Sequence, residues 1–151
     1  MKKPIAIASD HAALKLKREL MKHFDDFGVE YVDYGTYEEK SCNYPDYAEK
    51  LCAAIYEGKN DLGILVCGTG IGMSIVANKV PGIRCAHCHD TFSARATRQH
   101  NDSNVIAFGE RVIAAELMID IVELFLTTEF EGGRHVARLE TIREIEKKYS
   151  K

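Results

Sequence analysis

Proline is scarce in this sequence, with 3 copies among 151 residues, and the 11 glycines are no more than an ordinary number. These counts exclude a collagen-like chain, and a hydrophobic fraction of 46% excludes intrinsic disorder. The five cysteines do not suit a disulfide-stapled miniprotein, and their odd number favours free thiols in a reducing compartment. A chain of this length buries roughly 68–70% of its unfolded surface. We therefore expect residues 1–151 to form one domain around a core of its own.

A basic excess, a leader segment and a long apolar run are missing as well. Lys and Arg number 20 against 23 Asp and Glu, so no positive excess drives nucleic-acid binding by counterion release. Asp10 and His11 interrupt the first apolar run too early for a signal peptide. The longest uncharged stretch, residues 62–78, contains four glycines and is shorter than the roughly 20 residues of a membrane span. We expect a soluble, cytoplasmic protein with neither a nucleic-acid nor a membrane partner.

Short apolar runs alternate with longer amphipathic segments along the chain. The apolar runs predict five strands, at residues 5–9, 29–34, 62–67, 83–88 and 104–108. The amphipathic segments predict helices at about residues 12–27, 45–58, directly after 72, 91–100, 114–127 and 134–149. This alternation indicates a three-layer α/β/α, Rossmann-like open parallel sheet of five strands with helices on both faces. The order of the strands stays open.

Ligands of open α/β sheets bind beyond the carboxyl ends of the strands. Polar and reactive residues follow those ends in this sequence, namely Asp10-His11, Asn43-Tyr44, Cys67 with its glycines, His89-Asp90 and Gly109-Glu110-Arg111. We therefore expect the functional site at this edge of the sheet. His100-Asn101 ends a helix and precedes a strand, so it belongs at the opposite edge unless it serves a neighbouring subunit.

The sharpest local signal is Cys67-Gly68-Thr69-Gly70-Ile71-Gly72, between a predicted buried strand and a helix. A glycine turn in this place exposes successive backbone N–H groups, which suit an anion. Cys67 stands just before the helix start, where the helix dipole favours a thiolate that could act as base or nucleophile. The alternative is a buried structural cysteine. A nicotinamide or flavin site is disfavoured, because the G-x-G-x-G spacing is one residue short and follows the third strand.

Three other motifs allow both a functional and a structural interpretation. Residues 85–89 spell C-x-x-C-H, typical of haem attachment or zinc, but side chains alternate along a strand and cannot converge on one ion. We expect structural residues there. Asp10 is either functional or the cap of the next helix. Arg134 and Arg138 share a helix face and suit a phosphate or carboxylate, or else belong to a solvated surface.

Taken together, the motifs resemble those of the type B ribose-5-phosphate isomerases. This is a branch of the sugar-phosphate isomerases that also includes allose-6-phosphate and galactose-6-phosphate isomerases. The matching segments, in family order, are Ser9-Asp10-His11, Asn43-Tyr44-Pro45-Asp46-Tyr47-Ala48, Cys67-Gly68-Thr69-Gly70-Ile71-Gly72, Ala77-Asn78-Lys79, Arg98-Gln99-His100-Asn101-Asp102, Ala107-Phe108-Gly109 with Arg111, and Glu131-Gly132-Gly133-Arg134-His135. With Arg138 they span residues 9–138, nearly the whole chain.

The resemblance implies an aldose–ketose isomerase of the pentose phosphate pathway that needs neither metal nor cofactor. It would interconvert ribose 5-phosphate and ribulose 5-phosphate. By analogy His100 assists ring opening, and Cys67 moves a proton from C2 to C1 through a cis-enediolate, with Thr69 helping to position the sugar. The other substrate contacts implied are Asp10 for hydroxyls, backbone N–H groups of Gly68, Gly70, Ile71 and Gly72 for the oxyanion, His11, Arg134 and Arg138 for the phosphate, and Tyr44, Asn101 and Arg111.

The resemblance also implies a homodimer or homotetramer with active sites near subunit contacts. The C-terminal helix would extend to a partner subunit, and His100 and Asn101 would reach the partner's pocket. Two other functions stay open. One is an isomerase of a six-carbon phosphate such as allose 6-phosphate. The other is a non-catalytic, flavodoxin-like module that binds a nucleotide or phosphate, in which Cys67 is replaceable and His100 has no role.

Overall fold

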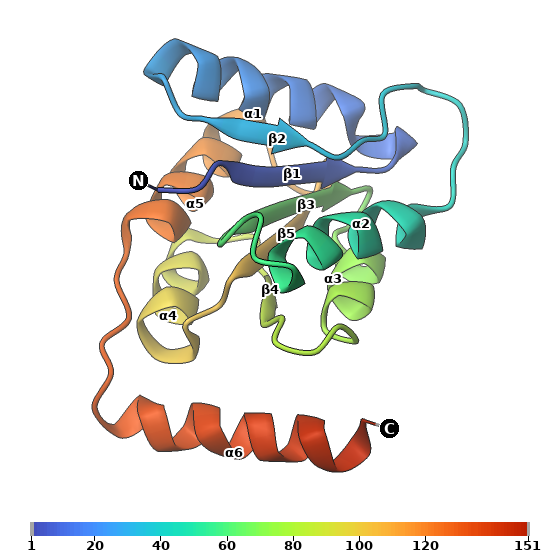
Figure 1. The fold of residues 1–151 in the computed structure, drawn as a ribbon. Helices are drawn as coiled ribbons and strands as arrows, with labels where there is room; N and C mark the ends of the chain where they lie inside the picture. The colour runs from blue at the N-terminus through green and yellow to red at the C-terminus, as the bar shows by residue number, and fades with distance from the viewer. Residues whose placement is uncertain (1, 151) are drawn as a thin grey trace.

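The computed structural model describes residues 2–150 and has the architecture expected from the sequence (Figure 1). The strands β1 (Ile5–Ser9), β2 (Tyr31–Asp33), β3 (Gly63–Cys67), β4 (Cys85–His87) and β5 (Val105–Gly109) form one parallel sheet in the order β2-β1-β3-β5-β4. The helices are α1 (Leu14–Phe27), preceded by a 3₁₀ turn (His11–Ala13), α2 (Tyr44–Tyr56), α3 (Ile71–Ala77), α4 (Thr91–Asn101), α5 (Ala115–Thr127) and α6 (Arg134–Tyr149). The predicted α/β/α fold is confirmed.

Two hydrophobic clusters hold the layers together, one on each face of the sheet. Helices α1, α4 and α5 pack on one face, and α2 and α3 pack on the other. Every residue of β3 and of β5 is buried, as near-continuous apolar sequences predict for central parallel strands. Cys85 packs against the α2–α3 cluster and Cys88 belongs to the other one. The expectation that these two side chains lie on opposite faces is confirmed, and all five cysteines are free.

The two edge strands are shorter than predicted. The strand expected at residues 29–34 begins only at Tyr31, because the N–H of Val29 still bonds to the carbonyl of Phe24 at the end of α1. The strand expected at residues 83–88 covers only three residues, because Ile83 donates to Val80 in a turn. Local hydrogen bonds thus take the ends of both apolar runs out of the sheet.

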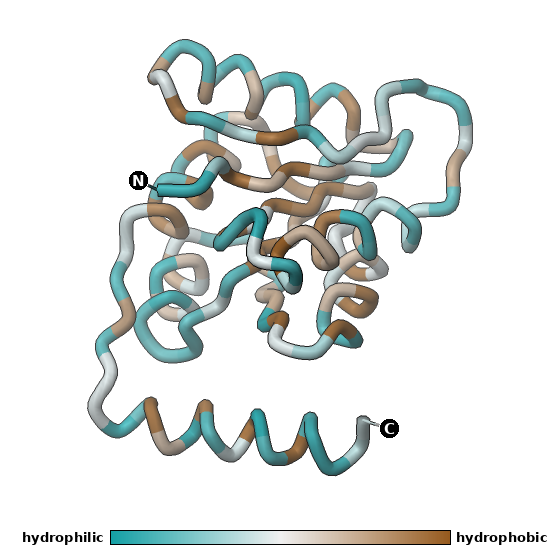
Figure 2. Tube along the Cα trace, in the orientation of Figure 1, coloured by the Kyte–Doolittle hydropathy of each residue, from teal (hydrophilic) through white to brown (hydrophobic). Residues whose placement is uncertain are grey.

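Helix α6 stands apart from the layered body of the molecule (Figure 1). Of its residues only His135 and Leu139 are buried, whereas Val136, Ile142 and Ile145 are exposed. Figure 2 shows hydrophobic positions recurring along α6 among hydrophilic ones. An apolar stripe on an exposed helix favours packing against another surface. Neither α6 nor any other helix within residues 2–150 is long and apolar enough to cross a membrane.

Candidate active site

Strand β3 carries Cys67 to the carboxyl edge of the sheet, directly before the glycine loop (residues 68–72). Cys67 is 6% exposed, and its Sγ accepts a hydrogen bond from the backbone N–H of Gly70 at 3.0 Å. The N–H group thus points at the sulfur, and a hydrogen bond of this kind to a charged acceptor is stronger than one to a neutral acceptor. One of the predicted loop N–H groups thus points at Cys67, whereas the N–H of Ile71 donates to Oγ1 of Thr69 at 3.3 Å, and the oxyanion role of the loop stays a prediction.

Gly70 is the residue that makes this contact possible. Its φ of 78° lies in the left-handed region, and a Cβ there would lie 2.8 Å from the backbone of Phe108 in β5. Backbone conformation and space both require glycine at this position. The motif therefore reflects the close approach of the loop to the neighbouring strand, and the anion site stays a prediction.

The turn after β5 lies against the same loop. Glu110 and Arg111 donate backbone hydrogen bonds of 2.9 Å and 3.0 Å to the carbonyls of Cys67 and Gly68. A Cβ on Gly68 would lie 3.3 Å from Nη1 of Arg111, so the guanidinium rests directly on the loop. A cation therefore lies against the first residue of the glycine loop. The structure thus places Arg111 and Cys67 at the same edge of the sheet, as predicted.

Three further predicted residues lie at this edge. The ring of Tyr44, at the start of α2, contacts Gly72, since a Cβ there would meet its ring atoms at 2.6–2.8 Å. Nδ1 of His11 accepts the backbone N–H of Cys42 at 3.2 Å, which leaves Nε2 of a neutral ring as the proton donor. Asp10 is 7% exposed and caps the 3₁₀ turn by accepting from Ala12 at 3.0 Å. Capping is therefore confirmed for Asp10, and its role toward substrate stays a prediction.

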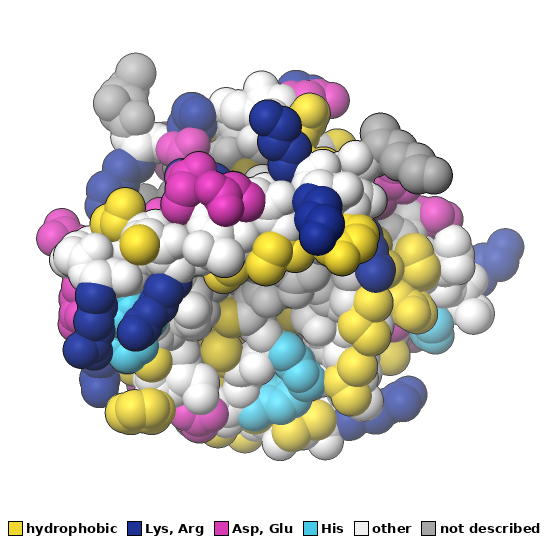
Figure 3. Space-filling view, turned by 90° about the horizontal axis from the view of Figure 1, so that it is seen from below, with side chains coloured by type: hydrophobic (Ala, Val, Ile, Leu, Met, Phe, Trp, Pro, Cys, Tyr) yellow, Lys and Arg dark blue, Asp and Glu magenta, His cyan; other side chains and the backbone are white. Residues whose placement is uncertain are grey.

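The remaining predicted residues lie elsewhere within this chain. Helix α4 runs back across the sheet, so His100 and Asn101 at its end lie at the amino edge, as the sequence indicates. The rings of His100 and His135 stack at 4.5 Å with an interplanar angle of 18°. Arg134 and Arg138 are exposed on the adjoining first turns of α6. Figure 3 shows histidines at separate places on the α6 face, one of them beside Lys and Arg side chains.

The histidine stack also has the composition of a metal site. Ligand atoms of His100, Glu131 and His135 lie within 4.8 Å of one another. Two imidazoles and a carboxylate suit zinc, but near-parallel rings present their nitrogens side by side rather than toward one ion. Burial lowers the pKa of His135, and the neighbouring His100 adds to the effect. The geometry in this chain is that of a stacked pair with one neutral ring.

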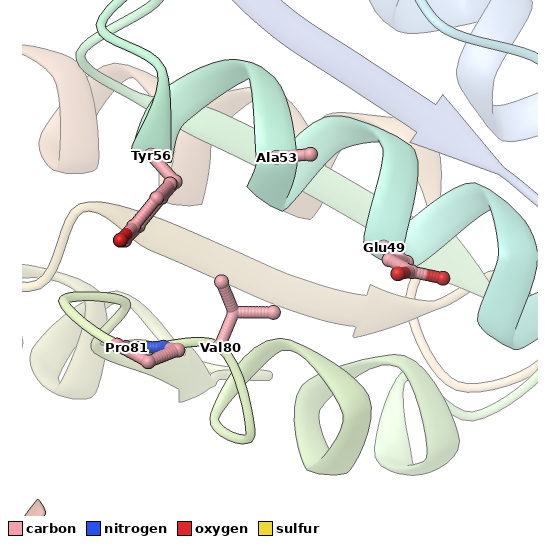
Figure 4. Close-up of a pocket in the computed structure, with 5 residues that line it drawn as sticks. All are labelled: Glu49, Ala53, Tyr56, Val80 and Pro81. Atoms are coloured by element: carbon pink, nitrogen blue, oxygen red, sulfur yellow. The ribbon is translucent and has the colours of Figure 1, made fainter. Parts of the chain in front are cut away.

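Two cavities lie away from Cys67. One of about 190 Å³ lies between α2 and the segment after α3, and is lined by Glu49, Ala53, Tyr56, Val80 and Pro81 (Figure 4). The other, of about 980 Å³, lies at the amino edge and is lined partly by Lys2, Phe24, Arg98 and Phe130. Neither lining includes Cys67 or the glycine loop.

Sequence reasoning assigned His87 no place at the site, and it placed His89 at the carboxyl edge without naming a contact. Both residues lie in the segment 85–89, for which we expect structural residues. Nε2 of His87 lies 2.8 Å from the carbonyl oxygen of Thr69, and Nε2 of His89 accepts the N–H of Gly109 at 3.0 Å. Side chains two residues apart in an extended segment point to the same face of the sheet. The spacing of His87 and His89 at the carboxyl end of a strand was therefore the sequence feature that could have indicated both contacts.

Comparison with known proteins settles the family. The family model described as ribose/galactose isomerase matches residues 5–142. This chain belongs to the ribose/galactose isomerase family. The match covers nearly the same span as the motifs quoted from the sequence, and it confirms the predicted isomerase class.

Relatives in the ribose/galactose isomerase family match over almost their full length. Ribose-5-phosphate isomerase B of Escherichia coli is 47% identical over 146 residues, 97% of this chain and 98% of the relative. D-erythrulose-4-phosphate isomerase of Pectobacterium atrosepticum is 49% identical over 140 residues, 91% of each chain. The solved ribose-5-phosphate isomerase B of Clostridium thermocellum is 50% identical, with a TM-score of 0.95 over 99% of this chain and 100% of that one.

Proposed function

We propose that this protein interconverts ribose 5-phosphate and ribulose 5-phosphate. The observation that carries the proposal is the hydrogen bond from the Gly70 N–H to Cys67 Sγ at 3.0 Å. This contact prepares Cys67 to act as the base, at the edge where open α/β sheets bind ligands. The names and coverage of the relatives support the substrate class.

After ring opening, the proposed reaction moves one proton from C2 to C1 and one hydroxyl proton from O2 to O1, and it needs no oxidant. His100 assists opening of the furanose by transferring a proton from the C1 hydroxyl to the ring oxygen. The Cys67 thiolate then takes the proton from C2, which leaves a cis-enediolate, and returns it to C1 as the second carbonyl forms. Loop N–H groups and Arg111 stabilise the developing negative oxygen, while Thr69 positions the sugar. The electron pairs stay within the substrate, so the aldose and the ketose have the same atoms and the same overall oxidation level.

The substrate contacts divide between the two edges of the sheet. We propose that Asp10 and Tyr44 contact the sugar, and that Nε2–H of His11 donates to the phosphate. The same proposal places Arg134 and Arg138 on the phosphate and Asn101 on the sugar, from the other edge. Because one chain keeps these groups apart, a complete site needs a second copy.

We accordingly propose a homodimer, or a homotetramer built from such dimers, in which each site receives His100 from a partner. The exposed apolar side chains of α6, including Ile142 and Ile145, support this arrangement because they need a surface to cover them. The histidine stack at the start of α6 couples that helix to His100. Docking of α6 would therefore also place the ring-opening group.

The deciding experiment measures turnover by the wild type and by Cys67→Ala, with a chelator present throughout. The substrates are ribose 5-phosphate, allose 6-phosphate and D-erythrulose 4-phosphate, the last because of the relative that carries its name. We expect turnover of ribose 5-phosphate that the chelator leaves unchanged and that Cys67→Ala reduces by orders of magnitude. Turnover of another sugar alone would keep the mechanism and change the substrate. Phosphate binding without any turnover would favour the non-catalytic module.

A further inference from the structure

The peptide group between Thr69 and Gly70 is held at both of its polar ends. Its N–H donates to Sγ of Cys67 at 3.0 Å. Its carbonyl oxygen lies 2.8 Å from Nε2 of His87. In a trans peptide the C=O and N–H point in opposite directions, so fixing one end aims the other. The direction of the hydrogen bond to sulfur is therefore set from the far side of the loop.

The donor and acceptor roles follow from the partners. A carbonyl oxygen only accepts, so Nε2 of His87 carries the proton in this contact. Nε2 of His89 accepts the N–H of Gly109, so its neutral ring carries the proton on Nδ1. The two rings meet edge to face at 4.6 Å and 76°. Burial and the adjacent His87 lower the pKa of His89, which keeps that acceptor neutral.

We propose that His87 is a positioning residue, which aims the Gly70 N–H at Cys67 by holding the carbonyl of Thr69. His89 supports it by fixing Gly109 and by packing against its ring. The proposal rests on the proposed role of Cys67 as the base. It adds a residue that touches neither substrate nor sulfur but controls how well the loop stabilises a thiolate.

The position of His87 separates this role from a packing role. The side chain is exposed at the end of the edge strand β4 and belongs to neither hydrophobic cluster. Removing an exposed side chain of this kind changes folding stability little. Its loss should therefore act through the hydrogen bond to Thr69 and the contact with His89, of which only the hydrogen bond is restored in His87→Gln.

The test measures the rate at which iodoacetamide alkylates Cys67, resolved from the other cysteines by peptide mass spectrometry. The variants are His87→Leu, His87→Asn and His87→Gln, because a glutamine amide nitrogen can replace Nε2 and the shorter asparagine cannot reach. His23→Leu serves as the control, since His23 pairs with Glu123 on another part of the surface. Melting temperatures confirm that each variant is folded.

We expect the ratio of alkylation rates at about pH 7 and about pH 10 to fall roughly tenfold in His87→Leu and His87→Asn. Loss of one charge-assisted hydrogen bond weakens stabilisation of the thiolate relative to the thiol by about that factor, and the nucleophilicity of the thiolate cancels because it enters the rates at both pH values alike. His87→Gln should restore the ratio, and His23→Leu should match the wild type. Isomerase kcat should follow the same order among the variants.

An unchanged ratio in folded His87→Leu and His87→Asn would overturn the proposal, as would equal loss in all three His87 variants. If His87→Leu does not fold, the comparison of His87→Asn with His87→Gln decides the matter. Because alkylation needs no substrate, the result stands even where no sugar phosphate is turned over. Failure of the proposed function and failure of this inference are therefore distinguishable.

Discussion

At the scale of single residues, the site depends on contacts that only one residue type permits. Gly70 combines a positive φ with an approach of 2.8 Å to the backbone of Phe108. Gly58 has nearly the same φ, 77°, but nothing within 4 Å of the place where a Cβ would lie. Comparing Gly70 with Gly58 therefore separates the cost of a left-handed backbone from the cost of the contact with Phe108.

We predict that Gly70→Ala lowers the free energy of unfolding by about 2–5 kcal/mol, from left-handed strain together with overpacking. Gly58→Ala should cost only about 1–2 kcal/mol, from the strain alone. Denaturant titrations give both values. Turnover should fall by orders of magnitude in Gly70→Ala only. Equal losses of stability in the two variants would mean that the contact with Phe108 is unimportant.

The cysteines offer a second prediction at this scale. Burial raises the pKa of Cys52 to about 12 and that of Cys88 to about 11, and it also raises the pKa of Cys85. These thiols should therefore stay protonated near neutral pH and resist alkylation. Cys42, half-buried beside His11, should react well before them. Peptide mass spectrometry of the labelled protein tests this order, and early labelling of Cys88 would contradict it.

At the scale of elements, α6 is notable because several of its apolar side chains stay exposed within the described residues 2–150, although Leu139 is buried. Ile142 is 46% and Ile145 is 53% exposed, although both lie on a regular helix. The far end of α6 contacts the body through Glu146, whose carboxylate accepts the N–H of Gly82 at 3.1 Å. The helix is thus held at both ends while its apolar stripe stays uncovered.

We predict that Ile142→Glu combined with Ile145→Glu yields a monomer. Both side chains are exposed in one chain, so the fold should survive, whereas a charged stripe cannot be buried against a partner. Analytical ultracentrifugation gives the mass, and circular dichroism checks the helix content. Turnover should be lost with the dimer. Glu144→Gln on the same helix is the matched control, and a fully active monomeric variant would refute the shared site.

At the scale of the whole molecule, the proposed catalytic pair comes from opposite edges of the sheet. Cys67 ends β3 at the carboxyl edge, and His100 lies at the end of α4 near the amino edge. If each active site takes one residue from each subunit, two different inactive variants should complement each other.

We predict that mixing Cys67→Ala with His100→Asn, after unfolding and refolding together, restores up to about a quarter of wild-type turnover. Half of randomly paired dimers are mixed, and one of the two sites in each mixed dimer is intact. Each variant refolded alone should stay inactive. Mixed dimers, verified by two affinity tags, that showed no activity would place both residues of a site in the same chain.

The sequence by itself determined the alternation of strands and helices and the family, and it predicted the carboxyl edge as the place of the site. These follow from patterns that repeat locally: apolar periodicity, glycine spacing and motif order. It also placed His100 at the opposite edge, because a helix between parallel strands must return across the sheet.

Only the tertiary structure decided which side chains meet. The bounds of the edge strands depended on competing hydrogen bonds at Val29 and Ile83, and the capping role of Asp10 on the exact turn after β1. The hydrogen bond from His87 to the carbonyl oxygen of Thr69 joins β4 to a loop eighteen positions earlier in the chain. Contacts between segments that far apart depend on the register and spacing of strands, and no local pattern carries that information.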